Sequence, residues 1–185
     1  MRPTDALEEQ RLVGAAKKGD TAAFEQLIKM YQHAIYYLCR RMTGTHQAAD
    51  DIAQETFIKA YFALSTFKEG FGFYGWIRKI AVNASLNYLK AKKREEPLGE
   101  RDPSITALPQ DELQKREAEQ LFHEALEALP PDQKAVFVLR VHEDQSYREI
   151  ARTLRISNGT VMSRLNRARQ KLKAALNVSS GRRRA

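Results

Sequence analysis

The chain has 185 residues and a formal net charge of +8, which allows one ordinary domain or two small ones and favours an anionic partner. The single cysteine, Cys39, excludes a disulfide framework and a thiolate-rich zinc site, and its place on an apolar helical stripe indicates a buried structural thiol. No apolar run approaches the roughly 18 residues that cross a bilayer, and no signal-peptide pattern is present, so we expect a cytoplasmic protein without membrane insertion.

The first two predicted helices each have one buried face. The first covers about Asp5 to Lys18 and ends at Gly19. Asp20 is a candidate N-cap for a second helix that continues to Met42. Apolar residues of this second helix recur at intervals of three and four, which is the spacing of a helix with one buried face. They are Phe24, Leu27, Ile28, Tyr31, Ile35, Leu38, Cys39 and Met42.

The third predicted helix, from about His46 to Leu64, separates a buried face from an acidic one. Its buried stripe consists of Ala49, Ile52, Ala53, Phe57, Ala60 and Leu64. The residues that face elsewhere are Asp50, Asp51, Gln54, Glu55 and Ile58. We interpret this acidic face as a surface that docks on a basic partner. A solvated acidic face, or a metal or acid/base site that includes His46, is the alternative.

A segment rich in aromatic residues and glycine, Phe67 to Trp76, follows this helix. Its glycines form the pattern Gly70-x-Gly72-x-x-Gly75, but a dinucleotide fingerprint requires a preceding strand, and here a helical pattern precedes it. Aromatic rings can stack on unpaired bases, so the segment predicts contact with opened nucleic acid. A cluster that fills the core is the alternative, above all for Trp76.

The fourth predicted helix, Ile77 to Arg94, is basic and contains no acidic residue. Its bases are Arg78, Lys79, Lys90, Lys92, Lys93 and Arg94, and its inner stripe is Ile77, Ile80, Ala81, Ala84 and Tyr88. Asn83 and Asn87 lie one turn apart on another face, beside Lys79 and Lys90. Such a helix favours phosphate as its partner.

Residues 95–119 differ in composition from the rest of the chain. They contain eight acidic and three basic residues, three prolines and few large apolar residues. This composition predicts a flexible acidic linker, with a helix that begins near Asp111. The chain is therefore expected to form two domains.

The C-terminal half predicts a helix-turn-helix. A helix from Leu121 to Leu129 ends at Pro130-Pro131-Asp132, and the next helix carries Val136, Phe137, Leu139 and Arg140. Ser146-Tyr147-Arg148-Glu149 is a capping box, and the helix that it starts buries Ile150, Ala151 and Leu154. A turn over Arg155 to Gly159, with Ser157 as a second N-cap, leads to a last helix that buries Val161, Leu165, Ala168 and Leu172.

The outward residues of this last helix suit the major groove of DNA. Short hydroxyl and amide side chains near its N-terminus, with arginines a turn later, match base edges and flanking phosphates. They are Thr160, Ser163, Arg164, Asn166 and Arg167. A three-helix core with a solvated basic face is the alternative. We expect the tail, 178–185, to be disordered and to add only nonspecific attraction to phosphate.

These motifs, in this order, resemble the extracytoplasmic-function (ECF) class of bacterial sigma factors. The resemblance covers about residues 10–176. It is carried by four stretches, which are Ala48 to Tyr61, Trp76 to Asn83, Leu129-Pro130-Pro131, and Ser146 to Ala151 with Gly159-Thr160-Val161-x-Ser163-Arg164. The resemblance implies an all-α fold with a region 2 domain (5–94), a linker (95–119), a helix-turn-helix region 4 domain (120–177) and the tail.

The resemblance also implies partners and residue roles. Asp50, Asp51, Gln54, Glu55 and Ile58 would dock on the β′ clamp helices of core RNA polymerase, whose β subunit is a further partner. Phe71, Phe73, Tyr74, Lys79, Asn83, Asn87 and Lys90 would contact the minus-ten promoter element, where the aromatic segment holds a flipped base. Thr160, Ser163, Arg164, Asn166 and Arg167 would contact the minus-thirty-five element.

The class also implies a cognate anti-sigma factor. Met162 stands where many relatives have a basic residue, so one DNA contact that the class implies has no basic side chain here. We expect no catalysis, metal or cofactor. The alternatives are a helix-turn-helix repressor or activator that binds DNA alone, and a nuclease that uses the acidic helix.

Overall fold

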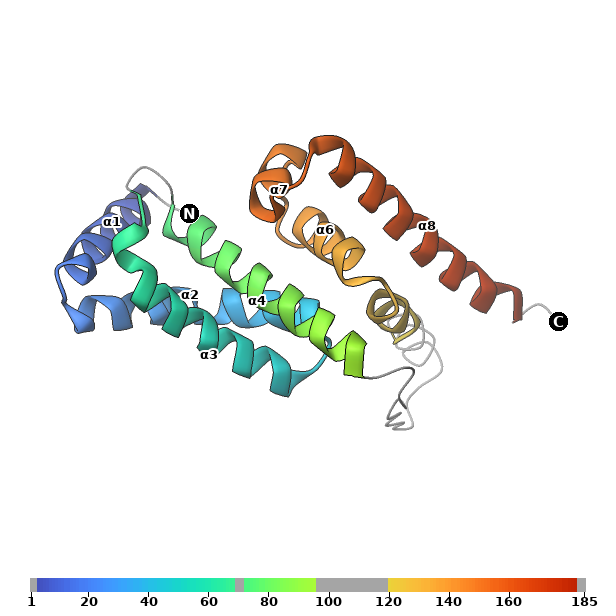
Figure 1. Cartoon of the computed structure of the whole chain (residues 1–185), viewed down its shortest axis with the longest axis horizontal. Helices are drawn as coiled ribbons and strands as arrows, with labels where there is room; N and C mark the ends of the chain where they lie inside the picture. Colours follow the sequence, from blue (N-terminus) through green and yellow to red (C-terminus); the bar gives the residue numbers. More distant parts are fainter. Residues whose placement is uncertain (1–2, 69–71, 96–119, 183–185) are drawn as a thin grey trace. The chain divides into compact units, whose positions relative to one another are not determined.

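The computed structural model describes residues 3–68, 72–95 and 120–182, and all regular secondary structure in these ranges is helical (Figure 1). The helices are α1 (Pro3–Lys17), α2 (Thr21–Thr43), α3 (His46–Ala63), the 3₁₀ helix η1 (Leu64–Thr66), α4 (Phe73–Glu95), α6 (Pro131–Val141), α7 (Tyr147–Leu154) and α8 (Asn158–Arg182). A further helical stretch covers 120–127. The expected all-α class is confirmed. The predicted linker and the helix start near Asp111 lie outside the described residues.

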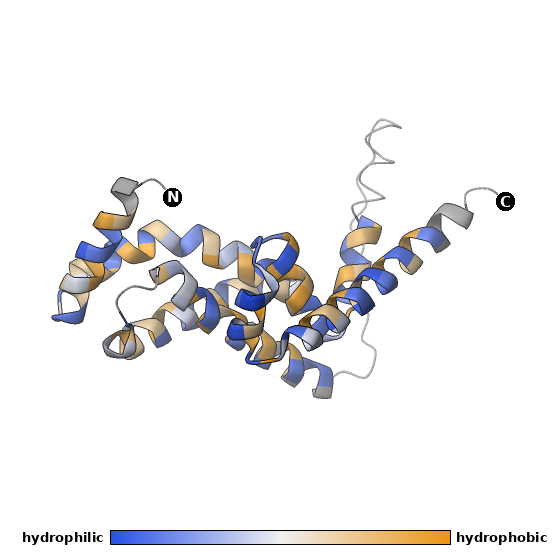
Figure 2. Ribbon diagram, turned by 90° about the horizontal axis from the view of Figure 1, so that it is seen from above, coloured by the Kyte–Doolittle hydropathy of each residue, from blue (hydrophilic) through white to orange (hydrophobic). Residues whose placement is uncertain are grey.

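The chain divides into two compact units, Met1–Tyr88 and Leu89–Ala185. The division falls inside α4, earlier than the boundary at residue 94 that the sequence predicts. Figure 2 shows hydrophobic and hydrophilic residues alternating around the helices, as expected for helices with one buried face. Within the described part of the chain, no helix combines the length and apolar character needed to cross a membrane.

Local capping signals set the helix ends of the first unit. Gly19 adopts a left-handed φ of 97° after α1, and the Asp20 carboxylate accepts a hydrogen bond from the Ala23 N–H at 3.0 Å. Gly44 ends α2 in the same left-handed region, at φ 87°. Thr45 caps α3 by accepting from the Ala48 N–H at 3.3 Å. These two N-caps and the Gly44 C-cap satisfy backbone groups that helix ends leave unpaired.

The core of the first unit follows the predicted stripes. All the apolar positions expected on the second helix are buried except Ile28, which is half-buried, and every predicted core residue of the third helix is buried. Cys39 is fully buried, and this desolvation raises the pKa of its thiol to about 11, because burial disfavours the charged thiolate.

The start of α4 differs from the prediction. The helix begins at Phe73 and not at Ile77, because Phe73 is a core residue with no exposed surface. Its ring lies 5.9 Å from Phe67 and 5.5 Å from Trp76, between ring centroids. The interpretation of this segment as a core-filling aromatic cluster is therefore correct for Phe67 and Phe73. Two of the inner-stripe residues, Ile80 and Tyr88, are only half-buried.

The second unit contains the predicted helix-turn-helix, α7 and α8. The turn ends at Ser157, and not at Gly159, because the Ser157 hydroxyl caps α8 by accepting from the Thr160 N–H at 3.1 Å. All four predicted core residues of α8 are buried, and so is Ile150 of α7. Ala151 and Leu154 are only half-buried. The helical backbone of α8 continues to Arg182, past residue 178, where a disordered tail was expected.

Candidate docking and nucleic-acid interfaces

α3 presents a stripe of exposed side chains directly opposite its core face. Asp51, Glu55, Ile58 and Phe62 are spaced four, three and four residues apart, so they lie in one row along the helix. We call these four residues the docking stripe. Ile58 is 57% exposed and Phe62 is 80% exposed. Large apolar side chains held in water beside acidic ones are typical of a surface that binds another protein.

Phe62 is the residue of this stripe that the sequence analysis missed. Its signal was present, because continuing the outward row from Ile58 by four residues reaches Phe62. Glu55 forms an ion pair with Lys59 one turn later, with 2.5 Å between nitrogen and oxygen, and both side chains are half exposed. An exposed pair of this kind contributes little to stability, so the Glu55 carboxylate can exchange partners at low cost.

The other two predicted docking residues of α3 flank a shallow pocket. Asp50 and Gln54 form one side of it together with Ala53 and Phe57, and Ile28, Gln32, His33 and Tyr36 of α2 form the other. Its volume is about 280 Å³, enough for one side chain of a partner protein. All five predicted docking residues are exposed. Among the described residues, no group of three or more His, Cys, Asp or Glu side chains could hold a metal.

The aromatic candidates for base contact fall into different environments. Phe73 has no exposed surface, so its ring is not accessible to a base in this structure. Phe71 lies outside the described residues. Tyr74 is half-buried; its ring stacks on Tyr31 at 5.5 Å, and the Arg78 guanidinium lies 5.2 Å from the ring centroid. Of the three candidates, Tyr74 is thus the described ring that retains some exposure.

The polar candidates of α4 share one face. Lys79, Asn83, Asn87 and Lys90 are spaced four, four and three residues apart, which places them in one row. Asn83, Asn87 and Lys90 are exposed, and Lys79 is half-buried. A row of amides flanked by cations can donate hydrogen bonds to bases and neutralise phosphates.

Recognition candidates on α8 divide into available and engaged side chains. Ser163, Asn166 and Arg167 are exposed, as is Met162 at 56%. The Thr160 hydroxyl lies 2.8 Å from that of Ser157, within the cap of the helix. Arg164 forms an ion pair with Asp132 of α6 at 3.0 Å and keeps only 27% of its side chain exposed. This pair fixes the direction of the Arg164 guanidinium, and it is a contact that the helix pattern did not reveal.

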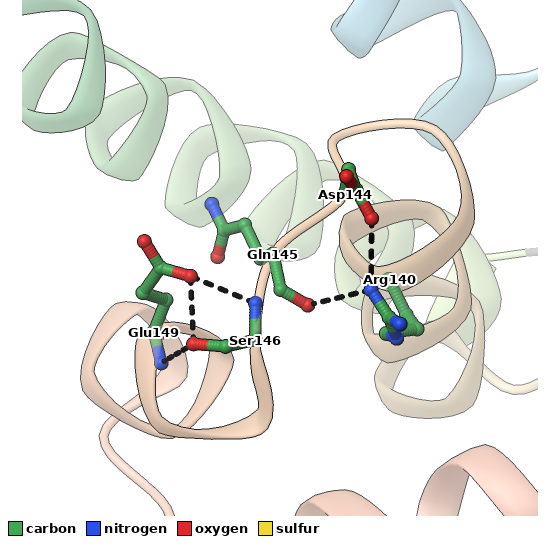
Figure 3. Close-up of polar contacts among 5 residues, drawn as sticks. All are labelled: Arg140, Asp144, Gln145, Ser146 and Glu149. Atoms are coloured by element: carbon green, nitrogen blue, oxygen red, sulfur yellow. Dashed lines mark hydrogen bonds and ion pairs between the residues drawn. The ribbon is translucent and has the colours of Figure 1, made fainter.

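A hydrogen-bonded loop holds α7 beside α6 (Figure 3). The Glu149 carboxylate accepts from both the N–H and the hydroxyl of Ser146 at 2.7 Å, and the Ser146 hydroxyl accepts from the Glu149 N–H at 3.3 Å. This confirms the predicted capping box. Arg140 donates to Asp144 at 3.0 Å and to the Gln145 carbonyl at 3.3 Å. The first helix of the helix-turn-helix therefore starts at a fixed point.

Together, the fold and these surfaces define a DNA-binding protein of the helix-turn-helix class with a second helical unit. Comparison with known families matches residues 27–95 to Sigma-70 region 2 and residues 119–172 to Sigma-70 region 4. The chain is 36% identical to the RNA polymerase sigma-H factor of Pseudomonas aeruginosa, over 91% of this chain and 94% of that protein. It is also 36% identical to the ECF RNA polymerase sigma-E factor of Escherichia coli K12, over 90% of this chain and 93% of that protein.

Solved structures agree with this relationship. CnrH, in complex with the cytosolic domain of CnrY, matches with a TM-score of 0.66 and 26% identity, over 92% of this chain and 98% of that one. The sigma factor RpoE, in complex with the anti-sigma factor NepR from Bartonella quintana, shares the fold at a TM-score of 0.63 and 24% identity, over 84% of this chain and 97% of that one. The chain belongs to the sigma-70 family of RNA polymerase sigma factors, in its ECF subgroup. Members of the family are transcription initiation factors that bind core RNA polymerase and promoter DNA.

Proposed function

We propose that this chain assembles with core RNA polymerase through α3, opens promoter DNA beside α4, and contacts the upstream promoter element with α8. The observation that carries the proposal is the docking stripe, because Ile58 and Phe62 stay in water while the opposite face of the same helix fills the core. On this proposal the stripe, with Asp50 and Gln54, meets the β′ clamp helices. The stripe thus offers two carboxylates to basic side chains and two apolar side chains for burial.

Energetics explain why such a chain requires the polymerase. Separating DNA costs about 1.4 kcal/mol in stacking for each base-pair step, whereas capturing one unstacked base returns about 1–3 kcal/mol. Separating several base-pair steps therefore costs more free energy than the capture of one base returns. The described residues that we assign to the minus-ten strand are Tyr74, Lys79, Asn83, Asn87 and Lys90, all on α4. Polymerase contacts, and upstream contacts by a tethered second domain, supply the remainder.

On α8, each candidate has a separate role in the proposal. Ser163, Asn166 and Arg167 face solvent and are assigned to base edges of the minus-thirty-five element. Arg164 is assigned to the flanking backbone, because its ion pair with Asp132 leaves only 27% of the side chain exposed and a guanidinium has further N–H donors that suit a phosphate. Thr160 contributes through its backbone at the N-terminus of α8, because its hydroxyl is engaged in the helix cap.

The proposal places the chain in the cytoplasm, where the polymerase acts, as an initiation factor and not as an enzyme. CnrH is solved with the cytosolic domain of CnrY, and RpoE with the anti-sigma factor NepR. We extend this to a partner of the anti-sigma class for the present chain, and to the β subunit of polymerase as a second contact in the holoenzyme.

Charge reversal tests the docking assignment. The variant Asp51→Lys with Glu55→Lys should retain its thermal unfolding midpoint, because both residues are exposed, but should bind core polymerase more weakly. Glu25→Lys with Lys29→Glu, on an exposed part of α2, alters charges of a helix surface outside the stripe and serves as the control. Unchanged core affinity in the folded double variant would remove α3 from the docking surface.

Promoter opening is tested by replacing residues 68–72 with a flexible polar linker of equal length. The replacement stops at Gly72, because Phe73 belongs to the core. Holoenzyme assembly and closed-complex binding should persist, whereas permanganate reactivity of unpaired thymines should fall and recover in part on a pre-melted promoter. Normal opening by this variant would contradict the assigned role. Footprinting without core polymerase separates the proposal from a helix-turn-helix regulator that binds DNA alone.

A further inference from the structure

α8 exposes one large apolar side chain on a surface that is otherwise polar and basic. Met162, the fifth residue of the helix, is 56% exposed, and no other large apolar side chain is exposed among the described ones of α8. The helix contains no acidic residue. Apolar residues that bind another protein occur in clusters, so a lone one on a basic helix is not typical of a protein interface.

The backbone around Met162 is fixed by its neighbours. Val161, the preceding residue, is fully buried, and Leu165, three residues later, is 1% exposed. The Ser157 hydroxyl accepts a hydrogen bond from the Thr160 N–H at 3.1 Å, which caps the first turn of α8. Because Val161 and Leu165 define the core face, Met162 projects beside that face into solvent. Its side chain is therefore available to a ligand without a change in the helix.

Met162 begins a row of exposed residues along α8. Asn166, Arg169 and Lys173 follow it at intervals of four, three and four residues, so the four side chains lie along one side of the helix. In a helix-turn-helix, residues near the N-terminus of the second helix contact base edges. Cations farther along the helix suit phosphates. The row thus places an apolar side chain at the end that meets bases and two cations at the end that meets backbone.

We propose that Met162 is a specificity-determining residue for the upstream promoter element, where it contacts the C5-methyl group of a thymine. The inference rests on the proposed function, in which α8 reads this element. In the major groove, thymine presents a methyl group, and apolar side chains recognise it by direct contact. Methionine is unbranched and adaptable, so it can cover such a group closely. It supplies base preference by burial, where a basic residue would supply it by hydrogen bonds.

The test changes the DNA by one methyl group at a time. Holoenzyme formed from this chain and core polymerase first selects an upstream element from promoter DNA that is randomised at this element. Each thymine of the selected element, on either strand, is then replaced by uracil, which lacks only the methyl group. Uracil at one position should weaken holoenzyme binding about fourfold, the size expected for one methyl group left in water. At the same position, 5-methylcytosine should bind more tightly than cytosine.

Three variants connect this effect to Met162. Met162→Gln keeps the length of the side chain but removes its apolar end, so thymine and uracil should bind equally at that position. Met162→Leu keeps an apolar side chain and should keep a preference for thymine. Val141→Ala is the control, because Val141 is 50% exposed at the end of α6, outside α8, and its removal should leave the uracil effect unchanged. All three should unfold at the midpoint of the parent chain, since both residues are exposed.

Each other outcome has a separate meaning. If no thymine of the selected element depends on its methyl group, or if Met162→Gln retains that dependence, the role of Met162 is overturned. If Met162→Gln instead weakens binding to core polymerase without DNA, Met162 contacts protein, and the inference is again overturned.

The proposed function is tested separately by Arg167→Ala. If the parent holoenzyme selects no preferred upstream element and Arg167→Ala has no effect on binding, α8 does not read DNA, and both the proposed function and this inference fail. If Arg167→Ala changes the selected element while Met162→Gln leaves the methyl dependence intact, only the role of Met162 fails.

Discussion

Truncation of Phe62 to alanine should weaken assembly with core polymerase by about 5- to 60-fold. Complete burial of a phenylalanine side chain contributes about 1.5–3 kcal/mol. Phe62 is 80% exposed in the free chain, so roughly 1–2.5 kcal/mol of this remains available on docking. A factor of ten in the dissociation constant corresponds to about 1.4 kcal/mol, which gives the expected range.

The same change should leave the free chain almost as stable as before. Phe62 loses little packing on truncation, so its unfolding free energy should change by less than about 0.5 kcal/mol. Phe57, on the core face of the same helix, is only 8% exposed, and Phe57→Ala should cost about 3–5 kcal/mol. Affinity measured by fluorescence anisotropy with labelled chain and core polymerase, beside thermal unfolding of each variant, separates the two effects.

Leu7→Ala is the matched control, because Leu7 is 70% exposed on α1 and lies outside the docking stripe. Its core affinity should equal that of the parent chain. Unchanged affinity in Phe62→Ala would refute the reasoning from exposed apolar surface. An equal loss in Leu7→Ala would show that the assay responds to surface hydrophobicity in general.

Arg167→Ala should cost about 1–3 kcal/mol at one upstream promoter position and relax base preference there, as measured with holoenzyme on single-base variants; equal losses on matched and mismatched elements would show that Arg167 contacts only the backbone. Ser146→Ala removes the cap of the eight-residue α7 and should lower the unfolding free energy by about 1 kcal/mol in urea, and an unchanged midpoint would contradict this. Burial raises the pKa of Cys39 to about 11, from a reference value of 9.0, so the unfolded thiol ionises first as pH rises. The stability contributed by the neutral thiol is complete below pH 9 and is lost toward pH 11, so the stability of the parent chain should fall relative to Cys39→Ala across this range; parallel curves would refute it.

Local features of the sequence were sufficient to predict most helices. The Asp20 N-cap, the Ser146–Glu149 capping box and the apolar stripes of α2, α3 and α8 involve residues at most four positions apart. Such signals depend on backbone geometry that every helix shares, so they can be read without knowing what the helix packs against. The outward faces of α3 and α8 follow from the same periodicity.

The environment of the aromatic segment could not be predicted in this way. Glycines and aromatic rings indicate a loop and a core cluster equally well, and only packing distinguishes Phe73, which is buried, from Tyr74, which is partly exposed. The Arg164–Asp132 ion pair likewise joins helices whose spacing in the sequence gives no sign of contact. These outcomes depend on which helices pack together.

The helical class, the helix-turn-helix and the exposed acidic face of α3 could all be predicted from the sequence, because each rests on a repeating pattern within a few turns of chain. The contacts of α1 with Phe67 and Phe73, in contrast, are visible only in the folded chain. Glu9 and Phe73 are separated by 64 positions, and Lys17 and Phe67 by 50. A hydrogen bond over such a distance forms only when the intervening helices have packed, so no local pattern of residues contains it.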